Sequence, residues 1–295
     1  MPTLSAYKEQ SLDASFQSTE SLLRRDRPRA HQQVWASGKS WGKRTLVPIL
    51  LPLVFPATIL LLWWIASAWA WLPENILPGP GTVAHTFWDL LTGGDLATNL
   101  GVSLRRVAEG SVIGLSLGLI LGLALGFSRE VESWIGPLFR IVAQIPSIAL
   151  IPLLMMVLGI DDRLKLFIMV KACVIPVAIT TADGIRNIPA HYLEVGKVLR
   201  LSRWSLITKI VLPGALPSIF SGVRQGLAHV WVSLVAVEVL ASADGIGYLM
   251  TWGRQIFQLD VVLVCVVVIG VIGFILDFGL KKLESVLLRW RGTGG

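Results

Sequence analysis

Six long apolar runs follow a polar N-terminal segment. Residues 1–44 are rich in Ser, Gln and Arg and show no hydrophobic period, so we expect a flexible cytosolic tail there. Each apolar run is near the roughly 20 residues that cross about 30 Å of hydrocarbon. They predict an all-α polytopic membrane protein with six transmembrane helices. The predicted spans are Leu46–Trp71, Leu104–Phe127, Trp134–Leu158, Leu164–Thr181, Leu216–Ala241 and Val261–Leu280.

The composition also favours a membrane protein. Of the 295 residues, 54% are hydrophobic and only 15% are charged, and the mean hydropathy is +0.68. A soluble domain carries about 25% charged residues, and a soluble particle of this size cannot hide so much apolar surface. Cys173 and Cys265 both lie inside apolar runs, so we expect no disulfide, no metal site and no cofactor.

The net charge of +7 is distributed as membrane topology requires. Most of the 26 Lys and Arg residues lie before residue 45, in the long loop at 183–213 and near the C-terminus. Cytosolic segments of membrane proteins carry this excess. We therefore expect both termini in the cytosol, lipid as the surrounding medium, and no nucleic-acid partner.

The second span carries a glycine at every fourth position. Such a ridge lets another helix approach closely, so that dispersion holds the two helices together. Two interpretations stay open: packing within one chain, and contact between subunits. The ridge consists of Gly110, Gly114, Gly118, Gly122 and Gly126.

The loop at about 183–213 contains a second kind of pattern. Residues 190–200 have helical period, with Tyr192, Val195, Val198 and Leu199 on one face. We expect this helix to lie along the membrane surface with its apolar face toward the helical bundle. Ser202 is a candidate N-cap for a second short helix that starts near Arg203.

This loop resembles the cytosolic loop of permease subunits of ATP-binding cassette (ABC) importers. Those permeases carry Glu-Ala-Ala, a Gly three residues later, and Ile-x-Leu-Pro after nine more. This chain has Glu194, keeps the Ile-x-Leu-Pro end, and places Arg200 where the family has Gly. A left-handed turn there would suit Gly, so Arg200 predicts a different or strained turn. The resemblance implies that an ATPase contacts Glu194, Gly196, Lys197, Arg200, Ile210, Leu212 and Pro213.

The resemblance extends over about residues 72–290. Leu77-Pro78-Gly79-Pro80, Gly245-Ile246-Gly247-Tyr248-Leu249 and several motifs between them are similar to the nitrate, sulfonate and taurine importer permeases, and most of all to the alkanesulfonate permeases. This likeness implies a first helix at 45–73 followed by a permease domain at 74–290 with the five-helix core of type I importers.

The family also implies partners, a location and a class of substrate. Two permease chains, as a homodimer, would bind two cytosolic ABC ATPases and an extracytoplasmic substrate-binding protein in the bacterial inner membrane. The chain contains no Gly-x4-Gly-Lys-Ser/Thr loop, so we expect no enzyme activity of its own and ATP hydrolysis by a separate subunit. The substrate expected is an aliphatic sulfonate, with taurine, nitrate, bicarbonate or a pyrimidine precursor as alternatives.

Charged residues inside the predicted spans are candidates for the transport pathway. A charge in hydrocarbon costs several kcal/mol, about 2.5–3.5 on insertion scales, so each needs a partner or water. We expect Lys171 to pair with Glu238 or Glu109, and Arg224 to pair with Asp277. The alternative is that Lys171 or Arg224 faces the pathway and attracts an anion. The candidates for intramembrane or pathway roles are Lys171, Arg224, Trp231 and Glu238.

Two other classes of protein remain as alternatives. A membrane enzyme or intramembrane protease would need a His cluster, paired Asp residues inside the spans or a Gly-x-Ser-x-Gly motif, which the sequence lacks. A membrane scaffold without transport activity is the more remote alternative.

Overall fold

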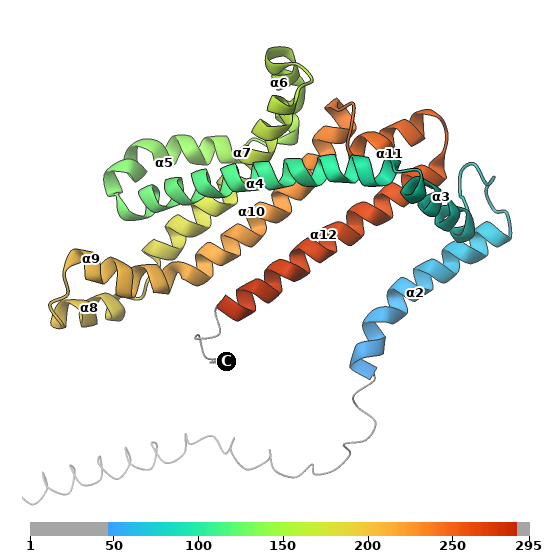
Figure 1. The fold of residues 1–295 in the computed structure, drawn as a ribbon. Helices are drawn as coiled ribbons and strands as arrows, with labels where there is room; N and C mark the ends of the chain where they lie inside the picture. The colour runs from blue at the N-terminus through green and yellow to red at the C-terminus, as the bar shows by residue number, and fades with distance from the viewer. Residues whose placement is uncertain (1–46, 288–295) are drawn as a thin grey trace, which may run out of the picture. The chain divides into compact units, whose positions relative to one another are not determined.

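The computed structural model of the protein describes residues 47–287, with side chains from residue 54 onward. Every regular element in this part of the chain is a helix (Figure 1). The predicted N-terminal tail at 1–44 lies outside the described residues. The elements are α2 (Val47–Ala68), α3 (Pro80–Thr92), α4 (Asp95–Phe127), α5 (Arg129–Gln144), the short 3-10 helix η1 (Ile148–Leu150), α6 (Ile151–Leu158), α7 (Asp162–Arg186), α8 (Ala190–Val198), α9 (Arg203–Leu206), the π-helix η2 (Ile207–Val211), α10 (Leu212–Ala241), α11 (Ile246–Gln255) and α12 (Leu259–Leu287).

The chain divides into two compact units after Leu61, within α2. The first unit includes the start of α2, where the Thr58 hydroxyl donates a hydrogen bond of 2.7 Å to the carbonyl of Val54, one turn earlier. The second unit begins at Leu62 and contains all the other helices.

Four helical stretches of the described chain are long and apolar enough to cross a membrane: α4, α7, α12 and the continuous stretch Arg203–Ala241. Helix α5 and the helix at 148–158 are long and apolar enough only when taken together, and they meet at a bend of 82°, as in a broken span or a re-entrant loop. With the apolar helix α2, these elements confirm the prediction of an all-α polytopic membrane protein.

The third predicted span is wrong as a single helix, because the chain bends inside it. Ile145 is extended (φ −78°, ψ 117°) and ends α5. The ring of Pro146 disfavours a helical conformation at the residue before it and lacks the N–H that would continue the ladder. Two further helices, α3 and α11, were not predicted, and they flank the long helices α4 and α12 in sequence.

The glycine ridge of α4 packs within the chain, against α7. A Cβ atom at Gly122 would come within 2.6 Å of the Thr181 side chain and 2.8 Å of the Ala178 backbone. The residues of α7 that meet the ridge are also spaced four apart, so the two helices interlock along five turns. This arrangement decides between the two interpretations in favour of packing within one chain. The facing residues of α7 are Met169, Cys173, Val177, Thr181 and Ile185.

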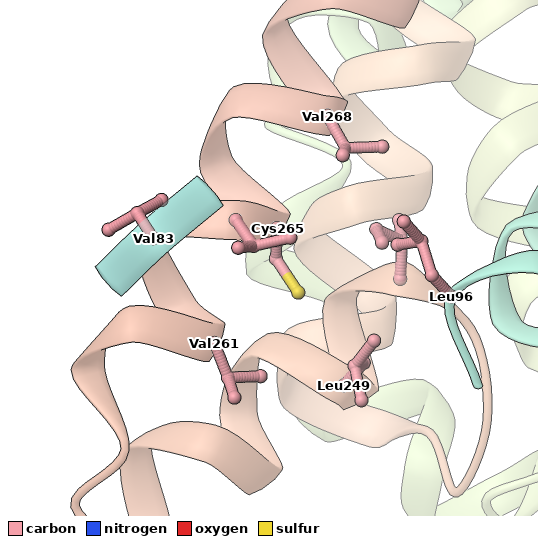
Figure 2. Packing of buried hydrophobic residues seen from close by; sticks show 8 residues of the cluster. Val83, Leu96, Leu249, Val261, Cys265 and Val268 are labelled. Atoms are coloured by element: carbon pink, nitrogen blue, oxygen red, sulfur yellow. The ribbon is translucent and has the colours of Figure 1, made fainter. Parts of the chain in front are cut away.

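A buried apolar cluster joins α3 and α4 to α11 and α12 (Figure 2). Cys265 of α12 lies at its centre and is a free thiol, as is the buried Cys173 of α7. Burial of these side chains holds the two unpredicted helices against the long ones. The cluster consists of Val83, Leu96, Ile246, Leu249, Val261, Val264, Cys265 and Val268.

Candidate functional site

Helix α8 ends in a tight left-handed turn at Arg200. The N–H of Leu201 donates to the carbonyl of Gly196, and the N–H of Arg200 donates to that of Lys197, both at 3.0 Å. This pair of bonds is a Schellman motif, which places the residue after the C-cap in the left-handed region. Arg200 adopts φ +50°. The turn is therefore the one that the family's Gly would favour, held here by a residue with a Cβ, at a cost of about 1–2 kcal/mol.

The apolar face of α8 does not pack against the bundle, and that expectation was wrong. Tyr192 and Val195 are about half exposed, at 53% and 52%, and Val198 is 81% exposed. Gly196 is the buried residue of the helix instead. A Cβ there would clash with Leu206, so the missing side chain lets α8 lie directly on α9 and η2. The structure thus leaves an apolar surface on α8 uncovered.

The other predicted residues of the loop lie on or beside this helix. Glu194, Lys197 and Arg200 are exposed. Ser202 accepts a hydrogen bond of 3.2 Å from the N–H of Ser205, which confirms it as the N-cap of α9.

The Ile-x-Leu-Pro end of the motif forms the junction between the loop and α10. Ile210 lies in the π-helix η2, and Leu212 and Pro213 begin α10. The Leu212 N–H donates to the carbonyl of Ile207, five residues earlier, as in a π-helix. Pro213 follows, where it has no N–H to donate. The loop therefore continues without a break into a membrane-spanning helix.

The predicted partners of the intramembrane charges were wrong. Lys171 donates to the carbonyl of Ile145 at 2.7 Å rather than to a carboxylate. Glu109 pairs with Arg105 at 3.5 Å, and Glu238 pairs with Arg106 at 3.1 Å.

Toward the start of α10, Arg224 lies 3.4 Å from Glu284, which is seven residues, about two turns, beyond the predicted partner Asp277 on α12. Asp277 pairs with Lys281 at 2.7 Å. Arg224, Trp231 and Asp277 line one small cavity of about 210 Å³ between α10 and α12. Trp231 is buried in an apolar cluster with residues of α4 and α7, so most of its surface contacts the chain itself.

A cluster of charges around the buried Arg106 was missed by the sequence prediction. Lys165 and Glu238 are also buried, whereas the side chains of Asp162 and Asp244 are about half exposed. Arg106, only 3% exposed, uses all five of its N–H groups, toward Asp162, Glu238 and Asp244. Lys165 lies 3.1 Å from Asp162. We call these five residues the Arg106 cluster. It joins α4, the start of α7, the end of α10 and the loop before α11.

Further hydrogen bonds complete this cluster. The Ser103 hydroxyl donates to Glu238 and accepts from the N–H of Ile246, all at 2.9 Å, and Gly247 N–H donates to Glu238 at 3.1 Å. In the loop, burial alone would raise the pKa of the Asp244 carboxyl, but hydrogen bonds and charge from Arg106 hold its pKa below the ordinary value. Each charge of the cluster thus has a partner of opposite sign, and Asp162 also lies 3.6 Å from the exposed Arg105.

A different cavity lies beside Lys171, where the bend between α5 and α6 meets α7 and α10. Its volume is about 480 Å³. The lining combines the Lys171 ammonium and several neutral polar groups with aliphatic side chains. The polar members are Ser147, Lys171, Thr180, Gln225, His229 and Ser233.

Comparison with known proteins assigns the family. Residues 114–287 match the model of the binding-protein-dependent transport system inner membrane component. The chain belongs to this family. It is a multi-pass membrane permease of the ABC transporter type, and its relatives are permeases rather than enzymes.

Three curated relatives cover most of this permease. The putative aliphatic sulfonates transport permease SsuC of Escherichia coli is 38% identical over 81% of this chain and 91% of its own length. SsuC of Bacillus subtilis is 33% identical over 82% and 87%. The bicarbonate transport system permease CmpB of Synechococcus elongatus is 31% identical over 85% and 93%.

Solved ABC transporters share the fold. A crystal structure of an amino acid ABC transporter with histidines matches with a TM-score of 0.53 and 16% identity, covering 69% of this chain and 97% of that chain. An inward-facing structure of the MetNI methionine ABC transporter gives a TM-score of 0.52 over 68% and 97%. At this identity the likeness concerns the fold alone.

Proposed function

We propose that this permease forms the membrane pathway of an ATP-driven importer for aliphatic sulfonates. The observation that carries the proposal is the 38% identity to the E. coli protein named as an aliphatic sulfonates transport permease, over 91% of that protein's length. The 31% identity to a bicarbonate permease makes bicarbonate the second candidate substrate. Both are small anions.

The proposed complex contains two copies of this permease, two cytosolic ABC ATPases and an extracytoplasmic binding protein. The permease domain is residues 74–290, and both termini face the cytosol of the bacterial inner membrane, because the basic residues concentrate there. ATP hydrolysis belongs to the ATPase subunits.

Helix α8 is the proposed contact with the ATPase. Its apolar residues are exposed, with Val198 at 81%, although soluble proteins rarely leave such a surface without a partner. Glu194 and Lys197 add charge to the same short helix. Gly196 seats this helix on α9 and η2, and these continue into α10. A rigid connection of this kind would transmit a movement of the ATPase to a membrane-spanning helix.

The experiment is ATP-driven uptake in proteoliposomes that contain the permease, its ATPase and its binding protein. Radiolabelled ethanesulfonate should accumulate only with ATP inside and binding protein outside. Uptake of bicarbonate but not of ethanesulfonate would replace the proposed substrate with the second candidate.

The coupling role is tested with Glu194→Lys in the same system. We expect an assembled complex that hydrolyses ATP but takes up much less substrate. Lys282→Glu, exposed on α12 and outside the α8–α9 segment, is the control for a reversal of charge. ATP-driven uptake at the wild-type rate in Glu194→Lys would remove the coupling role from this residue.

A further inference from the structure

We propose that the cavity beside Lys171 is a binding site for a small organic anion, with the Lys171 ammonium on the anionic head and aliphatic side chains around an uncharged tail. The inference rests on the proposed sulfonate import and deepens it, because it names the site and the form of substrate that fits. Lys171, the neighbouring polar groups and the cavity walls each contribute to the argument.

Lys171 retains an uncompensated positive charge. An ammonium has three donors. One bonds the Ile145 carbonyl at 2.7 Å, and the Ser147 hydroxyl is 3.5 Å away. No carboxylate of residues 54–287 lies within ion-pair distance of Lys171. Lys165, six residues earlier on α7, lies 3.1 Å from Asp162 and 3.7 Å from Asp244. A bound anion would supply the missing counter-charge.

The bend between α5 and the helix at 148–158 fixes this ammonium in place. Ile145 ends α5, and its carbonyl is free of the helical ladder because the chain leaves the helix at Pro146. The carbonyl end of a helix also attracts a cation. Two donors of Lys171 thus hold the side chain at the cavity, one on the Ile145 carbonyl and one, at 3.5 Å, on the Ser147 hydroxyl, and the third remains for a ligand.

Neutral polar groups of α10 lie across the same cavity from α7. Gln225 and His229 are exposed, and Ser233 is buried. The amide, imidazole and hydroxyl groups can donate to sulfonate oxygens without adding charge. These groups extend the site beyond a single lysine.

The aliphatic side chains that line the cavity favour a ligand with an uncharged tail. The volume of about 480 Å³ is in the range of ordinary ligand pockets, roughly 300–1,000 Å³. None of the described residues that line the cavity is acidic, so the ammonium of an aminoalkanesulfonate would be desolvated without a partner. A bare inorganic anion would leave the apolar walls unused. The walls include Ile145, Ile148, Ile175, Ile179 and Val232.

The test uses the complete transporter in proteoliposomes, with ethanesulfonate as substrate. Lys171→Gln keeps a donor for the Ile145 carbonyl but loses the charge, whereas Lys171→Arg keeps the charge. We expect ATP-driven uptake to fall about tenfold or more in Lys171→Gln and to stay within about threefold in Lys171→Arg. Lys281→Gln, which breaks an exposed pair with Asp277, is the matched control. Assembly is checked by size-exclusion chromatography of each complex.

A purely structural lysine gives a different result. If Lys171 only holds the bend, Lys171→Gln transports like the wild type, and that outcome overturns the site. If Lys171→Gln does not assemble, Lys171→Met is compared with Lys171→Arg. An anion site requires the positive charge, so uptake by assembled complexes should be kept in Lys171→Arg and lost in Lys171→Met. Equal competition of taurine and ethanesulfonate for uptake by the wild type would overturn the selection by the walls.

The proposed function can fail separately from the site. A wild-type transporter that takes up bicarbonate or nitrate but no sulfonate refutes sulfonate import. Loss of that uptake in Lys171→Gln would still support an anion site, while overturning the role of the apolar walls. Uptake of none of these anions by the wild type overturns both proposals.

Discussion

The Arg106 cluster and the α8–α9 segment contain the same kinds of charged residue in opposite surroundings. Arg106 and Glu238 are 3% and 1% exposed and are bonded to each other and to neighbours from four parts of the chain. Glu194, on a short helix with one buried residue, and Arg200, in the turn that follows it, are both exposed. The first region is satisfied by contacts within the chain. The second presents charge and apolar surface outward, as a surface for a partner does.

The largest loss of stability is expected when the charge pairs of the Arg106 cluster are broken. Arg106→Ala would leave the buried Glu238 carboxylate without its cation, which costs on the order of 3–5 kcal/mol of unfolding free energy. Unfolding in mixtures of SDS and mild detergent measures this change. The control is Arg105→Ala, whose side chain is 63% exposed, with an expected cost below about 1 kcal/mol. Equal losses for the two variants would contradict the comparison.

The next largest effect concerns the α4–α7 contact. Gly122→Ala places a Cβ within 2.8 Å of the Ala178 backbone, where no side chain can give way, so we expect a loss of about 1–3 kcal/mol. Gly101→Ala on the same helix meets nothing within 4 Å and should stabilise by about 1 kcal/mol through helix propensity. The same unfolding assay measures both changes in unfolding free energy. An unchanged unfolding free energy in Gly122→Ala would refute tight packing of the glycine ridge.

A smaller effect, of opposite sign, is expected at Arg200. Glycine removes the left-handed strain of about 1–2 kcal/mol. It also raises the conformational entropy of the unfolded chain, which lowers the unfolding free energy by about 0.4–1 kcal/mol. Arg200→Gly should therefore stabilise the protein by about 0.5–1 kcal/mol. Arg203→Gly, at the first position of α9, relieves no such strain and still raises the entropy of the unfolded chain, so it should instead destabilise the protein slightly. Stabilisation by both, or by neither, in thermal unfolding would show that the turn is unstrained.

The smallest effect on stability is expected on the exposed face of α8. Val198→Ser should change the unfolding free energy by no more than about 0.5 kcal/mol, because the side chain is 81% exposed. It should nevertheless weaken co-purification of the proposed ATPase with the permease. Val177→Ser, fully buried on α7, is the control for a valine that packs within the chain. A large loss of stability in Val198→Ser would show that this face is part of the fold.

Patterns local in sequence predicted much of the molecule. The apolar runs predicted the crossings, the four-residue glycine spacing predicted a helix contact, and Ser202 predicted the start of α9. These succeed because each depends on residues within a few turns of one another. The period of residues 190–200 predicted helix α8, which ends at Val198, but not which face packs, since Gly196, the buried residue, has no side chain to mark it.

Contacts between distant residues were beyond such patterns. Arg106 was not among the predicted candidates, and its partners Asp162 and Asp244 lie 56 and 138 residues away. Lys171 was expected to find a carboxylate, yet it bonds a backbone carbonyl 26 residues away, freed by a bend at Pro146.

The sequence by itself determined that this chain crosses a membrane as a helical bundle, because hydrophobic length, glycine spacing and capping residues act locally. The tertiary structure alone decided which charges neutralise one another and which remain for a partner or a ligand. Pairing depends on atoms approaching within a few ångströms, and only the packing of α4, α7 and α10 brings them there.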